Sequence, residues 1–390
     1  MYLFFMAKNI IRQIFLCIIL ICYCNLYSVP VNSNKNNVVN DSKNNKKDKK
    51  KNIVRILALD GGGTRGYAQV KFLERFCKDA NIKNLGKIFD IIAGTSIGGI
   101  NAVALANGMM PEDLEKFFTE KAKWIFTIRS IKDIFSNNAS IPSNKPNKMQ
   151  MLYMISTSKP FYKSVSEKSN YGSARLFNEM KKVFEDKLLT QLETNVILPA
   201  YDFSTCTPII FTNIKNIQNT FTNIKIVDAL MATASFPIYF PSFLINSKNI
   251  IDGGFFQCNP SMLAFTVAKK IYPSAKKYCI LSIGTGSKKY TIGFESKNII
   301  YNLLPMKYTR IWGVFNNSSK FANNIFLQNL SNNKDSNVYY YRFDFDLDQN
   351  RNCSFDTSTE AFFDYLKTAV NEKYNQDINK IKQFIINFTE

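Results

Sequence analysis

The stretch at residues 89–100, FDIIAGTSIGGI, constrains the fold of this chain more than any other segment. Residues 89–93 form a short apolar run typical of a buried strand, and residues 100–106 form an apolar run typical of a helix that ends near Gly108. A buried strand that passes through a sharp glycine turn into a helix predicts an α/β fold.

The turn itself has the pattern of a nucleophile elbow. Gly94 and Gly98 have no Cβ, so neighbouring backbone can crowd the turn while Ser96 stands at its apex, near the positive end of the following helix. Ser96 is therefore the candidate nucleophile. The alternative is a glycine-rich turn that serves only to pack the helix closely.

The chain contains no histidine, which limits how a serine could be activated. A serine hydroxyl is a weak nucleophile until a base accepts its proton, and the most familiar base is an imidazole held by a carboxylate. A Ser-His-Asp triad is excluded here. If Ser96 is a nucleophile, its base must be an aspartate, a glutamate or a lysine.

A second glycine turn follows the apolar strand predicted at residues 53–59. Residues 60–66 read DGGGTRG, and apolar residues at helical spacing come next. The pattern also fits a dinucleotide-binding G-x-G-x-x-G, but the next strand ends in the serine turn and not in the acidic residue that would hold a ribose. Backbone N–H groups of a glycine loop can instead approach a substrate oxygen, so this loop is the candidate oxyanion hole.

A third turn supplies the best candidate base. The apolar residues 249–251 lead to Asp252, which is followed by Gly253 and Gly254, so that the carboxylate can project into a crevice. The alternative is an aspartate that merely closes a tight turn. Other candidate bases remain open from the sequence alone: Asp60, Asp90, Asp202, Asp228 and Lys71.

The amino-terminal 51 residues differ in composition from the rest. Lys8 and Arg12 precede an apolar segment, and Ser28 suits a cleavage point, so residues 1–28 predict an export signal peptide, with a membrane anchor as the alternative. Residues 29–51 are rich in Asn and Lys and predict a disordered linker. Residues 52–390 are then the folded domain.

The formal net charge of +20 falls mostly on residues 52–390. This charge favours an anionic phospholipid surface as partner, whereas no nucleic-acid module with interleaved aromatic residues is found. Solvated lysines are an equally simple explanation. Beyond the leader the cysteines are widely spaced and odd in number, which predicts neither a disulfide framework nor a zinc site.

Further strands are predicted at 196–203, 208–212, 278–283 and from residue 338, and helices at 111–124, 176–192, 226–235 and 359–388. The polar segment 137–148 predicts a surface excursion, either a lid or a plain insertion.

Together the three glycine motifs resemble those of the patatin-like phospholipase family. Further matches are the segment 234–241, Asn259-Pro260, and the segment 282–286, so the resemblance covers roughly residues 52–290 in the family's order. It implies a three-layer α/β fold with a central, largely parallel sheet, related to α/β-hydrolase-type folds. One departure is Cys258, where the family often has asparagine.

The resemblance also implies a function. The family uses a Ser-Asp dyad, which carries onto Ser96 and Asp252, with an oxyanion site at Gly61, Gly62, Gly63, Thr64 and Arg65, and with no metal or cofactor. The expected activity is that of a lipid acyl hydrolase of phospholipase A type. The alternatives are a lysophospholipase or neutral-lipid esterase, and a catalytically silent lipid- or nucleotide-binding module.

Overall fold

A computed structural model describes residues 51–126, 172–288 and 308–389, except the single positions 216, 218, 219, 222, 238 and 334. These residues all belong to one compact unit. The predicted signal peptide at 1–28, the linker at 29–51 apart from Lys51, and the excursion at 137–148 lie outside the described residues. They stay predictions, as does export of the protein.

The unit is built on a mixed β-sheet whose strand order is β5-β4-β3-β2-β1-β8-β9. Strands β3, β2, β1, β8 and β9 run parallel to one another, while β4 and β7 each pair antiparallel with β3. The strands are β1 (Ile53–Leu59), β2 (Ile91–Gly94), β3 (Asn195–Asp202), β4 (Thr207–Thr212), β5 (Thr220–Phe221), β6 (Phe243–Ile245), β7 (Lys248–Asp252), β8 (Lys277–Ile283) and β9 (Val338–Phe343).

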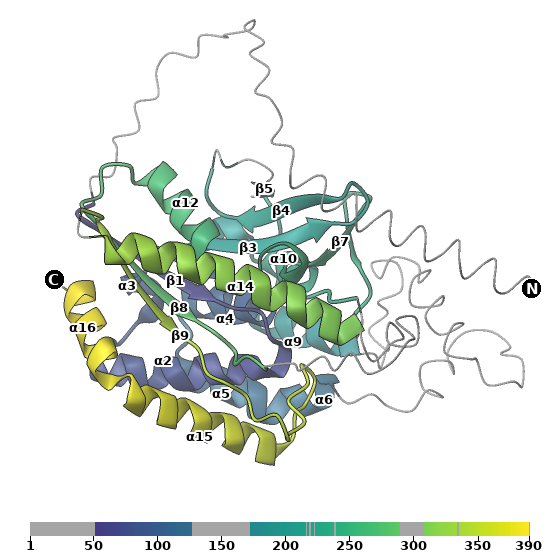
Figure 1. The fold of residues 1–390 in the computed structure, drawn as a ribbon. Coiled ribbons are helices and arrows are strands. Elements are labelled where there is room, and N and C mark those ends of the chain that lie inside the picture. Colours follow the sequence, from purple (N-terminus) through teal and green to yellow (C-terminus); the bar gives the residue numbers. More distant parts are fainter. Residues whose placement is uncertain are drawn as a thin grey trace, which may run out of the picture. The chain divides into compact units, whose positions relative to one another are not determined.

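Helices cover both faces of the sheet, as Figure 1 shows. The longer ones include α14, which runs across one face, and α2 and α15, which lie side by side over the other. The helices are α2 (Tyr67–Asp79), α3 (Leu85–Ile88), α4 (Ile97–Ala106), α5 (Pro111–Lys116), α6 (Lys123–Phe126), α9 (Gly172–Phe184), α10 (Ile226–Thr233), α11 (Gly254–Gln257), α12 (Ser261–Ile271), α14 (Tyr308–Asn332), α15 (Glu360–Gln376) and α16 (Ile378–Thr389), with short turns η1 (Gly63–Gly66), η2 (Phe117–Ala122) and η4 (Leu189–Gln191).

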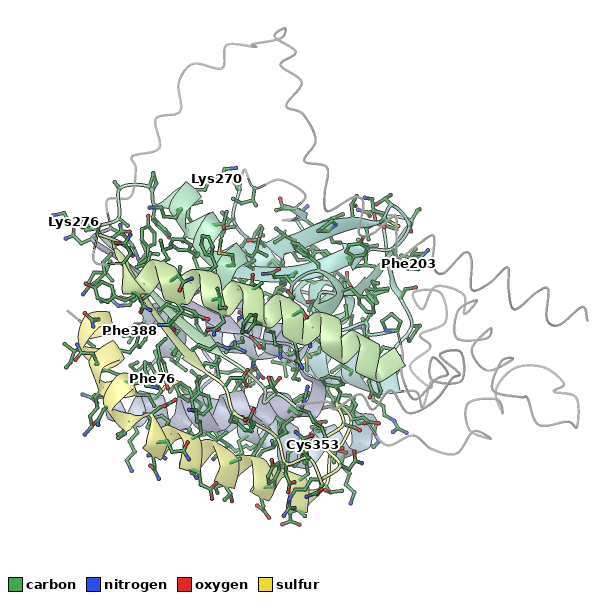
Figure 2. The ribbon with its side chains drawn as sticks, viewed as in Figure 1. Phe76, Phe203, Lys270, Lys276, Cys353 and Phe388 are labelled. Carbon is green, nitrogen blue, oxygen red and sulfur yellow. The ribbon has the colours of Figure 1, made fainter. Side chains whose placement is uncertain are left out.

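Alternation along the strands gives the unit two hydrophobic cores. In β1, Leu57 and Leu59 face the core under α2, α4, α10 and α15, whereas Val54 and Ile56 face the core under α12 and α14. Phe76 of α2 and Phe388 of α16 close one end of the first core, with ring centroids 5.9 Å apart (Figure 2). The predicted three-layer α/β fold is confirmed.

Two features of the fold differ from the sequence prediction. The helix expected over 176–192 is α9, which ends at Phe184 because Glu185 adopts a left-handed φ of 50°. The 25-residue helix α14 was not predicted. Its inward face carries Asn316, Lys320 and Asn323, so it lacks the apolar period that identifies a buried helix face.

The candidate site lies where the parallel strands end. Strands β1, β2 and β8 deliver their carboxyl ends to one edge of the sheet, and the Asp60 loop, the Ser96 turn and the Gly284–Gly286 turn follow them directly. This edge is where open α/β sheets place ligands. Within the described ranges, no helix has both the length and the apolar character that crossing a membrane requires.

Candidate active site

Ser96 stands at a strained turn between β2 and α4. Its backbone has φ 56° and ψ −123°, a conformation that an L-residue rarely adopts. The flanking glycines permit it: a Cβ on Gly94 would overlap the Gly98 carbonyl, and a Cβ on Gly98 would overlap the Leu59 carbonyl. The turn therefore has the geometry of a nucleophile elbow, as the sequence predicted.

The Ser96 hydroxyl is available for chemistry. Ser96 is the N-cap residue of α4, but its side chain caps no backbone amide, and it is only half-buried while its neighbours in the turn are fully buried. The Ser96 N–H donates to the Thr233 hydroxyl oxygen at 3.2 Å. The backbone of the turn is thus held from α10, and Ser96 lines the cavity described below.

Sheet register explains why Asp252 meets this serine. Ala93 of β2 pairs with Ile197 of β3, and three residues further along β3, Ala200 pairs with Asp252 of the antiparallel strand β7. Three residues beyond Ala93 is Ser96. Beyond the end of β2, strand β7 takes the place beside β3 and runs in the opposite direction. Strand β7 therefore ends next to the elbow.

The Asp252 carboxyl group is buried, with 2% of the residue exposed. Burial raises the pKa of Asp252 to about 7, although hydrogen bonds with the Ser96 side chain and the Gly254 amide lower it in part. The Gly254 N–H donates to Asp252 Oδ1 at 2.6 Å. Asp252 is thus a hydrogen-bonded carboxylate whose pKa lies near neutral, as a general base requires.

The turn after Asp252 is fixed by close backbone contacts. A Cβ on Gly253 would overlap the Pro199 carbonyl, and the Gly253 N–H donates to the Thr233 carbonyl at 3.1 Å. The Thr95 hydroxyl donates to the Gln257 carbonyl at 2.6 Å. These contacts join the Asp252 turn to the Ser96 turn.

The glycine loop lies beside Ser96, and some of its amides are already engaged. The Gly61 N–H donates to the Cys258 carbonyl at 3.1 Å, and the Thr64 N–H donates to the Phe355 carbonyl at 2.7 Å. The Thr285 hydroxyl donates to the Gly61 carbonyl at 3.0 Å. Of the predicted oxyanion donors, the amides of Gly62 and Gly63 are therefore the ones best placed to serve a substrate.

Arg65 shapes the loop from within. It is 5% exposed, its Nε donates to the Gly62 carbonyl at 3.3 Å, and its guanidinium lies 4.1 Å from the centre of the Phe355 ring. Arg65 does not line the cavity described below, so its contacts suit a role in holding the loop.

The rival bases have other partners. Asp60 is fully buried against Arg342 and Lys320, and Asp202 binds Lys248 and Thr205. Lys71 binds Glu74 and Glu115. Asp90 binds Lys51, and Asp228 belongs to α10; neither lines the cavity at Ser96.

A narrow apolar cavity of about 50 Å³ lies at Ser96 and Asp252. Its walls are mostly aromatic and aliphatic, with Ile97, Ile100, Phe117, Phe126, Leu176, Phe236, Tyr239, Phe240 and Phe355. Gly61, Gly62 and Gly63 lie at the same cavity. The lining suits an apolar group placed beside the serine.

Cys258 lies at the base of the cavity. The residue is 1% exposed, and its thiol hydrogen-bonds the Gly61 carbonyl with Sγ 3.6 Å from the oxygen. Burial raises the pKa of the thiol, which keeps it protonated. In the described ranges no group of three or more His, Cys, Asp or Glu side chains is arranged to hold a metal ion.

Sequence reasoning missed the residues that support the three turns. Thr233, Thr285, Asn316, Lys320, Arg342 and Phe355 contact the site or its loops but come from distant segments. Only Thr233 and Thr285 carried a signal, since Thr233 precedes the conspicuous segment at 234–241 and Thr285 lies within Gly284-Thr285-Gly286.

Comparisons with known proteins identify the family of the chain. Residues 57–265 match the family model described as patatin-like phospholipase. A cGAMP-activated phospholipase of Vibrio cholerae is 31% identical over 261 residues, which cover 63% of this chain and 68% of that protein. The chain belongs to the patatin-like phospholipase family.

Other similar proteins extend across kingdoms. Patatin-like protein 1 of Arabidopsis thaliana is 27% identical over 283 residues, covering 66% of this chain and 64% of its own length. Among solved structures, VipD from Legionella pneumophila aligns with 86% of this chain and 67% of its own at 12% identity, with a TM-score of 0.41.

Proposed function

We propose that this protein is a lipid acyl hydrolase of phospholipase A type, which uses Ser96 as nucleophile and Asp252 as general base. The observation that carries the proposal is that one apolar cavity is lined both by the half-buried Ser96, on its strained turn, and by Asp252, a buried carboxylate whose pKa is raised to about 7. Because the chain lacks histidine, this carboxylate takes the role of general base that an imidazole has in a Ser-His-Asp triad.

The reaction proceeds in two steps. Ser96 Oγ attacks the ester carbonyl carbon while its proton passes to Asp252, and the tetrahedral intermediate collapses to an acyl-enzyme as Asp252 returns the proton to the departing lysophospholipid oxygen. Water then attacks the acyl-enzyme and gives a proton to Asp252. Fatty acid leaves, and that proton returns to Ser96 Oγ.

The oxyanion of each intermediate is stabilised by the amides of Gly62 and Gly63. These glycines line the cavity beside Ser96, whereas the Gly61 and Thr64 amides are already bound to carbonyls. Donors fixed in advance at the place where charge develops are worth a few kcal/mol each in such reactions.

The cavity supports a long-chain acyl ester as substrate. Its aromatic and aliphatic walls suit an acyl chain, and the lining residues within the described ranges include no lysine or arginine that could pair with a phosphate. This argues against the nucleotide-binding alternative at this site. The headgroup would then lie at the cavity mouth, where a lysophospholipid or a neutral lipid also fits.

The test is fatty-acid release from anionic phospholipid vesicles in the presence of a chelator, with wild type, Ser96→Ala and Asp252→Asn. Two relatives are described as cGAMP-activated phospholipases, so each protein is assayed with and without cGAMP. We expect release by wild type only, under at least one of these conditions. Release by Ser96→Ala at the wild-type rate would contradict the proposal.

Release of fatty acid from lysophospholipid or from neutral lipid, but not from intact phospholipid, would favour the esterase alternatives and correct the substrate class. An inert wild type under every condition, together with saturable binding of vesicles, would favour a silent lipid-binding module.

A further inference from the structure

Helix α14 contacts both halves of the active site through one face. Asn316, Lys320 and Asn323 recur at helical spacing and so point the same way. All three residues lie beyond residue 265, where the match to the family model ends. This face of α14 is polar next to the active site and becomes apolar only at Leu327, which is fully buried in the core under α12.

Lys320 reaches the glycine loop through Asp60, the residue that begins it. Lys320 Nζ lies 3.2 Å from Asp60 Oδ2, and the same carboxylate receives both guanidinium arms of Arg342, at 2.8 and 2.7 Å. Arg342 Nη2 also lies 2.7 Å from Asp344 Oδ2. Asp60, Lys320 and Arg342 are each less than one-tenth exposed.

This buried ion cluster is held in its charged form. Burial opposes the charge of Arg342, but the carboxylates of Asp60 and Asp344 outweigh it and raise the pKa of Arg342 well above its usual range. Burial raises the pKa of Asp344, and Arg342 with Lys320 lowers it further than burial raises it. Removing one member would leave a buried charge unpaired, which is costly and forces the neighbours to move.

The same face of α14 also contacts the segment after Asp252. Asn323 Nδ2 donates to the Asn259 carbonyl at 3.1 Å, and Asn316 is buried on the same helix face. Cys258 in turn accepts the Gly61 amide on its carbonyl. One helix face therefore contacts the loop of the oxyanion donors and the segment that follows the base.

We propose that Lys320 and Arg342 are positioning residues, which hold Asp60 and thereby fix the Gly62 and Gly63 amides relative to Ser96 and Asp252. The inference rests on the proposed function for the role of those amides. The proposal adds residues of α14 and β9 to the active site, and both elements follow the region that matches the family model. A misplacement of about 1 Å at such donors is enough to lower turnover by about 100-fold.

The first test compares Lys320→Met and Arg342→Lys with wild type. The turnover number is expressed per active serine, titrated to completion with a lipophilic phosphonate, so that unfolded protein does not count. We expect kcat per titrated serine to fall by about 10- to 100-fold while KM stays within about twofold. Arg342→Lys should lose less than Arg342→Met, because it keeps one cationic donor.

Leu327→Ala is the matched control on the same helix. It leaves a cavity in the core under α12 and lowers the melting temperature, but it leaves both cationic partners of Asp60 in place. We expect its kcat per titrated serine to equal that of wild type. If Lys320→Met and Arg342→Lys also keep wild-type kcat per serine and lose only thermal stability, the positioning role is wrong.

Amide hydrogen exchange gives a readout that needs no turnover. If the ion cluster holds the loop, the peptide covering residues 57–66 exchanges about tenfold faster or more in Lys320→Met than in Leu327→Ala. The two variants are compared at temperatures equally far below their melting temperatures. Equal exchange in the two variants would overturn the proposal even if the protein proved inactive. Conversely, activity retained by Ser96→Ala would count against the proposed function and not against the positioning of the loop.

Discussion

Two of the three glycine turns at the candidate active site, the Ser96 elbow and the Gly61–Gly63 loop, are fixed in different ways. At the Ser96 elbow, Gly94 and Gly98 let the backbone pack so closely that an added Cβ would overlap a carbonyl only a few residues away or on the next strand. At the Gly61–Gly63 loop, the contacts come from afar: a Cβ on Gly62 would overlap Thr285, and one on Gly63 would overlap the Phe355 carbonyl.

The elbow is fixed mainly by contacts that are local in sequence, whereas the loop is fixed by long-range contacts. The elbow needs a strand, a helix and two glycines, all within a dozen residues. The loop needs Thr285 after β8, Arg342 in β9, Lys320 in α14 and Phe355 after β9. The proposed nucleophile is therefore shaped mainly by one short segment, whereas the proposed oxyanion loop also depends on α14, β9 and the turns after β8 and β9.

The largest effect is expected from Ser96→Ala. Loss of the attacking oxygen removes the covalent pathway, and kcat should fall by roughly 10⁴- to 10⁶-fold. The measurement is fatty-acid release per folded protein. Because the side chain caps nothing in α4, the melting temperature should stay close to that of wild type, which separates loss of chemistry from loss of fold.

Asp252→Asn should come next, with a loss on the order of 10⁴-fold in kcat, because an amide cannot accept the serine proton. Asparagine keeps the shape of the side chain. If this variant retained activity within tenfold of wild type, the base would be another group.

Because the pKa of Asp252 is raised, activity should increase with pH while the stability of the fold should decrease with pH. Below a pKa of about 7 the base is protonated, so kcat/KM should fall tenfold per pH unit and should level off above pH 7. A profile that titrates near pH 4 would place the base in a solvated site and contradict the account.

For stability, the folded state binds the Asp252 proton more tightly than the unfolded state does. The ionised carboxylate therefore disfavours folding, and stability should fall as pH rises from about 4 to about 7. Asp252→Asn removes this cost, so it should melt higher than wild type at pH 8. Thermal unfolding of both proteins at pH 5 and pH 8 measures the difference.

Gly62→Ala tests the long-range turn. The new Cβ would overlap Thr285 and displace the loop, so kcat should fall by about 10²- to 10³-fold. Gly108→Ala is the control, because its φ of 93° disfavours alanine while an added Cβ meets no atom within 4 Å. That variant should lose about 1 kcal/mol of stability and keep its activity.

The smallest effect is expected from Lys71→Met. Lys71 is bound to Glu74 and Glu115, so it is not the base, and kcat should change by less than about twofold. A large loss of turnover without loss of stability would revive a Ser-Lys pair.

Much of the site could be predicted from sequence because its local parts carry glycine signatures. Ser96 and the glycine loop each follow an apolar parallel strand, and a parallel sheet brings such strand ends to one edge, while Asp252 ends a further apolar strand before its own glycine turn. The register of β7 against β3 could not be predicted. Nothing in residues 249–254 indicates that β7 runs antiparallel beside β3 and ends facing the end of β2. Helix α14 escaped prediction because its inward face is polar where it contacts Asp60.

The proposed reaction requires Ser96 as nucleophile and Asp252 as the base that activates it. Labelling with a lipophilic phosphonate, followed by peptide mass spectrometry, examines both roles at once. We expect a single adduct on Ser96, formed at a rate that rises with pH through about 7 and is slowed by orders of magnitude in Asp252→Asn. An adduct on another residue, or equal labelling rates in wild type and Asp252→Asn, would contradict the proposed reaction.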